Sequence, residues 1–149
     1  MTATKKKILI TGASGFIGRN LAASLAGKYE VRCLVRDLAR AKALLPAGVE
    51  LVQGDMTDAA SLKAAVSGVD AVVHLAARKS DEPDIVAVNV GGAHNLVATC
   101  RAAGVRRVIN VGSQAARIAR RGAYGETKAQ SDAVFNGAGL EATTLLPSL

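Results

Sequence analysis

The chain has 149 residues, of which half are apolar and 21% are charged, and its formal net charge is +7. A chain of this length corresponds to one domain and can bury roughly 68–70% of its unfolded surface, so we expect one hydrophobic core. Cys33 and Cys100 lie far apart and outside any C-x-x-C spacing, so the sequence predicts neither a disulfide framework nor a zinc or other metal site.

The positive charge is spread along the whole chain. Residues 1–75 carry ten Lys and Arg against six Asp and Glu, and residues 76–149 carry nine against six. Nucleic-acid-binding proteins concentrate their basic residues and often add aromatic stacking platforms, whereas the two Phe and two Tyr here are scattered. We therefore expect no nucleic-acid partner and favour small anionic ligands.

No targeting or membrane segment is expected. The apolar stretch after Lys7 is too short for a signal peptide, and the longest uncharged run, 85–100, contains polar residues and falls short of the ~18 apolar residues of a membrane span. Together with the unpaired cysteines, this predicts a reduced, cytoplasmic protein without a membrane partner.

Short β-branched runs alternate with Ala-rich segments of helical length. The expected strands are Lys7–Thr11, Glu30–Val35, Val49–Gln53, Ala71–Leu75, Val105–Val111 and Ala142–Leu146. The expected helices are Phe16–Ala26, Leu38–Leu44, Ala59–Val66, Asp84–Ala102 and Tyr124–Asn136. Strict alternation with short connections predicts an α/β fold, a doubly wound parallel sheet of about six strands, with ligands bound beyond the carboxyl ends of the strands.

A glycine-rich turn follows the first strand directly. Residues 11–18 read TGASGFIG and open a helix, so Gly12 suits a tight turn, Gly15 the approach of a pyrophosphate, and Gly18 close packing of helix on strand. An ordinary strand-to-helix turn is the alternative, but the strand-turn-helix context favours dinucleotide binding. The other residues expected to contact the cofactor here are Ser14, Phe16 and Ile17.

The end of the second strand bears on the choice of dinucleotide. NAD sites usually place an acidic residue there for the ribose hydroxyls, and NADP sites place a cation for the 2′-phosphate. Here Val35 is followed by Arg36, with Arg40 and Lys42 a helical turn further on, so NADP is favoured over NAD. Two alternatives remain open, because Arg36 can instead pair with Asp37, and Asp37 can itself reach a ribose.

The next two strands end in further candidate contacts. Asp55 suits the adenine amino group with Met56 against the ring, although Asp55 is also a plausible helix cap. We interpret His74 as a hydrogen-bonded core residue rather than a catalyst. The small residues after it, which would let a cofactor lie against the backbone, are Leu75, Ala76 and Ala77.

Ser113 follows the fifth strand, and Tyr124 and Lys128 follow eleven residues later at i and i+4 of the last helix. That spacing puts Tyr124 and Lys128 on one helix face, where an ammonium group favours the phenolate and makes the tyrosine a general acid or base. Ser113 can hydrogen-bond the same substrate oxygen, and Lys128 can also reach cofactor ribose hydroxyls. A surface pair is the alternative for an isolated match, but the serine and the glycine turn favour a site.

Taken together, the ordered motifs resemble the short-chain dehydrogenase/reductase superfamily, and within it the extended NAD(P)-dependent epimerase/dehydratase branch. The residues that carry the resemblance are 11–18, 54–58, 68–77, 89–92, Ser113, Tyr124 and Lys128. The resemblance implies a Rossmann fold in which Ser113, Tyr124 and Lys128 move a proton while hydride passes to or from nicotinamide on a small-molecule carbonyl or hydroxyl substrate. It also implies a supporting role for Asn89, and the second strand is similar to that of NADP-using flavonol-reductase-like members.

The chain departs from that family in two places. Residues 114–123 lack the elements typical of sugar epimerases and dehydratases, which disfavours sugar-nucleotide dehydration. Extended members continue beyond residue 149 into a segment that builds the substrate pocket, so we interpret 1–149 as the NAD(P)-binding domain with that segment absent. The alternatives to an oxidoreductase or epimerase are therefore a non-catalytic NAD(P)-binding module and a fragment of a longer enzyme. Helices Asp84–Ala102 and Tyr124–Asn136 resemble those that pair in family dimers, so a homodimer is expected.

Overall fold

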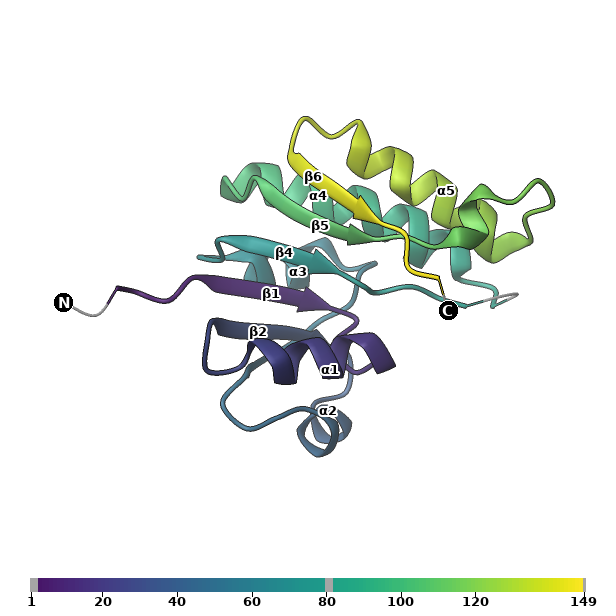
Figure 1. The fold of residues 1–149 in the computed structure, drawn as a ribbon. Coiled ribbons are helices and arrows are strands. Elements are labelled where there is room, and N and C mark those ends of the chain that lie inside the picture. Colours follow the sequence, from purple (N-terminus) through teal and green to yellow (C-terminus); the bar gives the residue numbers. More distant parts are fainter. Residues whose placement is uncertain (1–2, 80–81, 149) are drawn as a thin grey trace.

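In a computed structural model that describes residues 3–79 and 82–148, six strands form one parallel sheet in the order β3-β2-β1-β4-β5-β6 (Figure 1). The strands are β1 Lys7–Thr11, β2 Glu30–Val35, β3 Glu50–Gln53, β4 Ala71–His74, β5 Arg107–Val111 and β6 Glu141–Leu145. The helices are α1 Phe16–Leu25, α2 Leu38–Leu44, α3 Ala59–Val66, α4 Gly92–Ala103 and α5 Ala123–Asn136, with a π-helical turn η1 Ala87–Gly91 and a 3-10 helix η2 Gln114–Arg117. The expected doubly wound α/β fold is confirmed.

Alternate residues of the central strand enter different cores. Leu9 lies in a cluster with residues of α3, α4 and α5, whereas its neighbour Ile10 lies in a second cluster with residues of α1 and α2. Because side chains alternate across a strand, this places helices on both faces of the sheet, as parallel sheets require. Figure 1 shows α1 and α2 at the β1–β2 half, and α4 and α5 at the half that contains β5 and β6.

The order of strands reverses between β1 and β4, which pair with each other through Thr11 and His74 at their carboxyl ends. One half of the sheet grows outward from β1 and the other from β4. Such a switch point opens a crevice beyond the carboxyl ends of the two central strands. The loops after β1 and β4 therefore face each other across the position where ligands bind in this architecture.

The helix expected over residues 84–102 is present as an uninterrupted helical run over residues 85–103, but it contains a π-helical segment. A π-helical turn over Ala87–Gly91 precedes α4, which ends at Ala103. A π turn inserts one extra residue and rotates the side chains that follow, and it turns Asn89 into the interior, where its exposed fraction is 1%. The remaining boundaries differ from expectation by at most two residues, except that η2 is an additional element.

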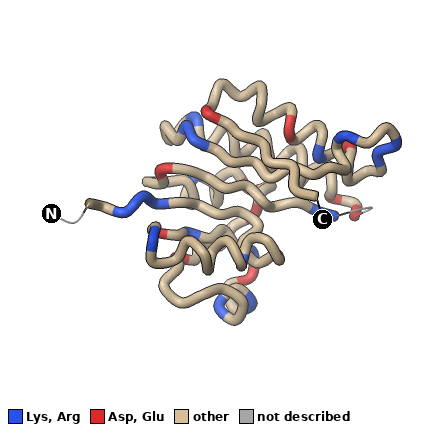
Figure 2. The backbone as a smooth tube through the Cα atoms, viewed as in Figure 1, with Lys and Arg blue, Asp and Glu red and all other residues tan. Residues whose placement is uncertain are grey.

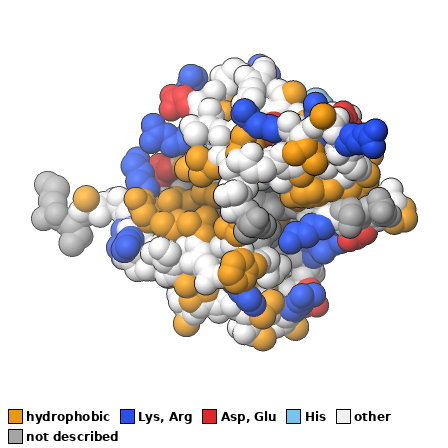
Figure 3. Space-filling model, turned by 45° about the vertical axis from the view of Figure 1, so that its right-hand side comes forward, with side chains coloured by type: hydrophobic (Ala, Val, Ile, Leu, Met, Phe, Trp, Pro, Cys, Tyr) orange, Lys and Arg blue, Asp and Glu red, His pale blue; other side chains and the backbone are white. Residues whose placement is uncertain are grey.

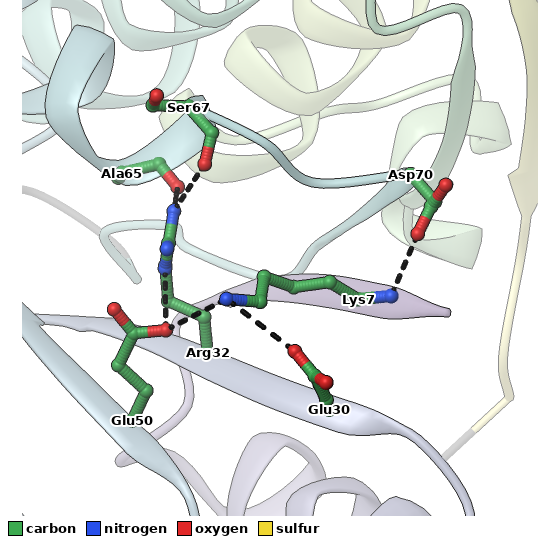
Figure 4. Close-up of polar contacts among 7 residues, drawn as sticks. All are labelled: Lys7, Glu30, Arg32, Glu50, Ala65, Ser67 and Asp70. Atoms are coloured by element: carbon green, nitrogen blue, oxygen red, sulfur yellow. Dashed lines mark hydrogen bonds and ion pairs between the residues drawn. The ribbon is translucent and has the colours of Figure 1, made fainter. Parts of the chain in front are cut away.

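A polar network ties the opposite, amino-terminal edge of the sheet together (Figure 4). Arg32 is buried, and its guanidinium donates to Glu50 Oε2 at 2.9 Å and to the carbonyl oxygens of Ala65 and Ser67 at 2.8 and 2.7 Å. The Arg32 hydrogen bond, opposed by partial burial, holds the pKa of Glu50 below its usual range. Arg32 therefore fastens the carboxyl end of α3 to β2 and β3.

The positions of Lys, Arg, Asp and Glu are spread along the backbone from end to end rather than gathered in one segment (Figure 2). None of the helices among residues 3–79 and 82–148 combines the length and the apolar composition that a membrane crossing needs.

Candidate functional site

The turn after β1 is built from glycines whose side-chain positions are occupied by backbone. Gly12 has φ +71°, and a Cβ there would lie 2.6 Å from the amide nitrogen of Ala76 in the loop after β4. A Cβ on Gly18 would overlap the carbonyl oxygen of Gly12, so α1 packs directly on the turn. Gly15 caps α1 without a side-chain hydrogen bond, which leaves amide hydrogens at the positive end of the helix dipole.

A single cleft of about 350 Å³ lies beyond the carboxyl ends of the strands and collects nearly all the expected site residues. Those that line it are Gly12, Ser14, Gly15, Phe16, Ile17, Gly18, Arg36, Asp55, Met56, Leu75, Ala76, Ala77, Ser113, Tyr124 and Lys128. The exception is Asn89, which is buried behind the wall. The view of Figure 3 brings this end of the sheet forward and shows hydrophobic and basic side chains side by side around it.

Arg36 stands at the end of β2 and lines the cleft. Its carbonyl oxygen accepts a hydrogen bond from Gln53 Nε2 at 3.0 Å, and its guanidinium forms no ion pair with any described residue. Asp37 is occupied elsewhere, because its carboxylate accepts from the Arg40 amide at 2.9 Å and caps α2. The structure therefore shows no Arg36–Asp37 ion pair, contrary to that alternative, and Arg36 lines the cleft together with Asp55, on which its charge acts.

Asp55 forms a local turn that fixes its carboxylate at the cleft wall. Its Oδ1 accepts from the amide and the hydroxyl of Thr57 at 2.8 and 2.7 Å, and these two bonds hold its pKa below the usual range. The residue that caps α3 is Asp58, whose Oδ1 accepts from Ala60 at 3.0 Å, so the helix-cap interpretation of Asp55 is wrong. Met56 is buried, with its Cβ 2.8 Å from where a side chain on Gly92 would begin.

His74 is a core residue, as expected. Its Nδ1 lies 2.8 Å from the Thr11 hydroxyl, and its ring lies 5.1 Å from that of Phe135. Burial lowers the pKa of His74 to about 3, and the nearby charge of Lys128 adds to that effect. The imidazole is therefore neutral at physiological pH and acts as a hydrogen-bonding spacer between β1 and β4.

Ser113, Tyr124 and Lys128 come from two elements that pack tightly on each other. Ser113 begins η2, where its Oγ accepts from the Ala115 amide at 3.1 Å. A Cβ on Gly125 would lie 2.5 Å from the Ala115 carbonyl oxygen, so only glycine after Tyr124 lets α5 approach η2 this closely. Tyr124 is partly exposed in the cleft, where its hydroxyl is available to a ligand.

Lys128 is a buried cation. Its exposed fraction is 2%, and its Nζ donates to the carbonyl oxygen of Val111 at 2.9 Å, at the end of β5. Burial lowers its pKa, and the charge of Asp132 opposes that effect. Lys128 also lines the cleft, one helical turn after Tyr124 on α5.

Asn89 connects two walls of the cleft. Its Oδ1 accepts from the Arg78 amide at 2.7 Å, and its Nδ2 donates to the Arg78 carbonyl at 3.1 Å and to the Thr127 hydroxyl at 3.0 Å. The first pair fixes the loop after β4, and the third bond fixes α5 between Tyr124 and Lys128. Asn89 thus supports the site without facing the cleft.

The structure adds cleft residues that the sequence reading missed. Arg78 and Lys79 follow the small residues after β4 and place two basic side chains at the wall, and Arg78 is paired with Glu82 and Asp84 at 3.2 and 3.0 Å. The sequence holds no signal for them beyond their position after a strand. The other additional lining residues are Leu34, Val35, Gly54, Val88, Val111, Gly112 and Pro147.

Comparison with known proteins places this geometry in context. The sequence model of the NAD dependent epimerase/dehydratase family matches residues 8–134. The 3 beta-hydroxysteroid dehydrogenase/Delta 5-->4-isomerase of Mycobacterium tuberculosis is 38% identical over 125 residues, which cover 76% of this chain and 33% of that protein. The Photosystem II assembly factor Ycf39 of Cyanophora paradoxa is 32% identical over 104 residues, which cover 68% and 32%.

Among solved structures, the Bordetella bronchiseptica enzyme WbmG in complex with NAD superposes with a TM-score of 0.84 at 27% identity, covering 96% of this chain and 53% of that one. The chain therefore spans about a third of the length of these two curated relatives and about half of WbmG.

Proposed function

This chain belongs to the NAD dependent epimerase/dehydratase family, within the short-chain dehydrogenase/reductase superfamily, and from that membership we propose that it binds NADP and interconverts a carbonyl and a hydroxyl group on a small molecule. The observation that carries the proposal is the single cleft into which the glycine turn, Arg36 and the Ser113–Tyr124–Lys128 group all open. These parts come from distant stretches of sequence, and each has a different task in the same reaction.

The backbone around the glycine turn fits a pyrophosphate. Side chains at Gly12 and Gly18 would fill space that backbone now occupies, so the start of α1 and the loop at Ala76 stay close to the turn. Gly15 leaves the first amides of α1 without a side-chain cap. Amide groups at a helix N-terminus bind phosphate through hydrogen bonds and the helix dipole. Arg36 and Asp55, which line the cleft after β2 and β3, would then hold the adenosine end of the dinucleotide.

NADP is the preferred cofactor in this proposal because of the Arg36 charge. Within the described residues, Arg36 forms no ion pair within 4 Å, and its charge adds to the Thr57 hydrogen bonds in lowering the pKa of Asp55 on the same cleft wall. The neighbouring Asp37 is engaged through Oδ1 as the cap of α2. A guanidinium at this position forms charge-assisted hydrogen bonds with a 2′-phosphate. Asp55 remains available for the adenine amino group through its second oxygen, since Oδ1 is held by Thr57.

When bound, the nicotinamide ring supplies or accepts the hydride. In the direction of reduction, the Tyr124 hydroxyl donates its proton to the carbonyl oxygen that becomes the alcohol, and in the reverse direction the Tyr124 phenolate takes that proton back. The Ser113 hydroxyl holds the same oxygen by a hydrogen bond. The Lys128 ammonium, buried next to this group, stabilises the negative charge on Tyr124.

The proposal is tested by titrating the chain with NADPH and NADH and then assaying the oxidation of hydroxysteroids and the reduction of the corresponding ketosteroids, since one relative carries the name of a 3 beta-hydroxysteroid dehydrogenase. We expect tighter binding of NADPH and turnover that depends on Tyr124. Failure to bind either cofactor would contradict the proposal.

A second function, a dinucleotide-binding module without turnover, is supported by one comparison. Ycf39, 32% identical, carries the name of an assembly factor rather than of an enzyme. The two functions separate in the same experiment, because a module binds NADPH at the glycine turn but leaves every substrate unchanged, and substitution of Tyr124 then has no measurable consequence.

A further inference from the structure

We infer that Asp132, held in place by Asn110, is a positioning residue that keeps the Lys128 ammonium charged at the floor of the cleft. The inference deepens the proposed function, on which its catalytic meaning rests, because Lys128 is the cation of that mechanism. The effect of Asp132 on the Lys128 pKa can be measured in the protein alone, without cofactor or substrate.

Burial lowers the pKa of Lys128, and a nearby anion opposes that effect. The side chain is almost fully buried, and its Nζ donates to one neutral group, the Val111 carbonyl oxygen, at 2.9 Å. Three titratable side chains surround it. His74 of β4 is buried and neutral and supplies no negative charge, and Tyr124 lies one turn earlier on α5. Asp132 lies one turn later on the same helix, with its carboxylate at Gly112, next to the Val111 carbonyl that holds Lys128. Within the described residues it forms no ion pair with Lys128 closer than 4 Å, and at this longer range its charge raises the lysine pKa against the effect of burial.

Asn110 orients the Asp132 carboxylate. Asn110 is fully buried on β5, and its Nδ2 donates to Asp132 Oδ1 at 2.8 Å and to the Thr144 hydroxyl at 3.3 Å. Its own Oδ1 is buried and has no hydrogen-bond partner among the described residues. Leaving a buried carbonyl oxygen without a hydrogen bond destabilises the fold. The hydrogen bonds that Asn110 Nδ2 donates, including the one to the Asp132 carboxylate, offset that loss. The reversed amide would place oxygen against oxygen and lose the hydrogen bond between Asn110 and Asp132.

Gly112 makes room for the carboxylate beneath the strand end. A Cβ on Gly112 would lie 2.9 and 3.0 Å from the two carboxylate oxygens of Asp132. Gly112 follows Val111, whose carbonyl oxygen holds Lys128, and it lines the cleft between Val111 and Ser113. Asp132 and Lys128 therefore contact neighbouring stretches of the same short backbone segment. Because Gly112 has no side chain, the Asp132 carboxylate can lie against the backbone at this position.

The test is an NMR titration of the lysine side-chain Cε–Hε resonances, with Lys128→Arg used to assign the Lys128 signal. Asp132→Asn removes the charge but keeps an oxygen that accepts from Asn110. Glu126→Gln is the matched control, because it removes the same charge from an exposed position on the same helix. We expect the midpoint of the Lys128 titration to shift to lower pH in Asp132→Asn, to stay unchanged in Glu126→Gln, and to be largely restored in Asp132→Glu.

An unchanged Lys128 midpoint in folded Asp132→Asn would overturn the inference. If Asp132→Asn does not fold, Asn110→Ala provides the second variant, because it keeps the carboxylate but removes the group that orients it, and the Lys128 midpoint should again move to lower pH. An Asn110→Ala midpoint equal to that of the wild type would then overturn it. A protein that shows the shift but never turns over a substrate supports the inference and contradicts the enzymatic function, so the two failures are distinguishable.

Discussion

The side-chain amide of Asn89 donates to the Thr127 hydroxyl at 3.0 Å, across a sequence separation of 38 residues. Through this bond the π-helical turn that precedes α4 is joined to α5, between the positions of Tyr124 and Lys128. The same asparagine holds the backbone of Arg78 with two further bonds, so one buried side chain sets the distance between opposite walls of the cleft.

We predict that Asn89→Ala lowers the free energy of unfolding by about 3 kcal/mol, because it leaves buried partner groups without a hydrogen bond, each at a cost of roughly 1–3 kcal/mol. Urea unfolding followed by circular dichroism measures this. Asn20→Ala is the control, since Asn20 makes one exposed bond to the Phe16 carbonyl and should cost no more than about 0.5 kcal/mol. Equal losses in the two variants would contradict the role given to Asn89.

Arg36→Ala should weaken NADPH binding by roughly 10- to 100-fold, the equivalent of the ~1.5–3 kcal/mol that hydrogen bonds to charged groups contribute. NADH binding should change by less than about twofold, because NADH lacks the 2′-phosphate. Fluorescence titration with both cofactors gives the four constants. Lys42→Ala is the control, because it removes the same charge from an exposed position outside the cleft. It measures how much NADPH binding depends on the net charge of the protein alone. Parallel losses for NADPH and NADH would show that Arg36 does not read the 2′-phosphate.

Gly12→Ala should weaken NADPH binding roughly tenfold or more, because the added Cβ collides with the Ala76 amide and moves the turn. Gly27→Ala provides the comparison. Gly27 also has positive φ, at +82°, but nothing lies within 4 Å of its Cβ position, so this variant carries only backbone strain of about 1–3 kcal/mol. Isothermal titration calorimetry on both folded variants compares their affinities for NADPH. Equal affinities would contradict the prediction that a Cβ at Gly12 disturbs the cofactor site by colliding with the Ala76 backbone.

Because burial lowers the pKa of His74, we predict that the free energy of unfolding falls as the pH is lowered below 6.5. This pKa is lowered from 6.5 to about 3 in the folded protein, so below pH 6.5 the unfolded chain binds a proton that the folded chain does not. The stability that His74 contributes is therefore complete above pH 6.5 and is lost as the pH falls toward 3, by up to about 1.4 kcal/mol per pH unit. Urea unfolding between pH 7 and 5 should show a shallower slope for His74→Asn. Identical slopes would mean that the folded protein protonates His74 normally.

Much of the fold and of the cleft was predictable because the responsible residues have few alternative roles. Gly12 and Gly18 stand where any side chain would overlap backbone, and their spacing after a β-branched strand is visible in the sequence. Strands such as β1, with Leu9 and Ile10 in two different cores, appear as uninterrupted apolar runs. The parallel sheet and the position of its switch point follow from those runs and from the short connections between them.

Other features depend on contacts that local sequence does not encode. The π-helical turn at Ala87–Gly91 differs from an α-helix by one inserted residue, and the pull of Asn89 toward Arg78 and Thr127 becomes visible only in three dimensions. Asp37 and Asp55 both follow strands, yet only Asp37 caps a helix, because a third carboxylate, Asp58, stands closer to the start of α3. The pairing of Asn110 with Asp132 likewise joins a strand to a helix that lies 22 residues away.

In the proposed mechanism, Tyr124 transfers the proton that accompanies hydride transfer. The most direct test of this step is the turnover number of Tyr124→Phe, measured beside the dissociation constant for NADPH on the same preparation. We predict that turnover falls by at least about 100-fold, as expected for the loss of a general acid, while the dissociation constant stays within about twofold. Wild-type turnover in Tyr124→Phe with intact NADPH binding would contradict the claim.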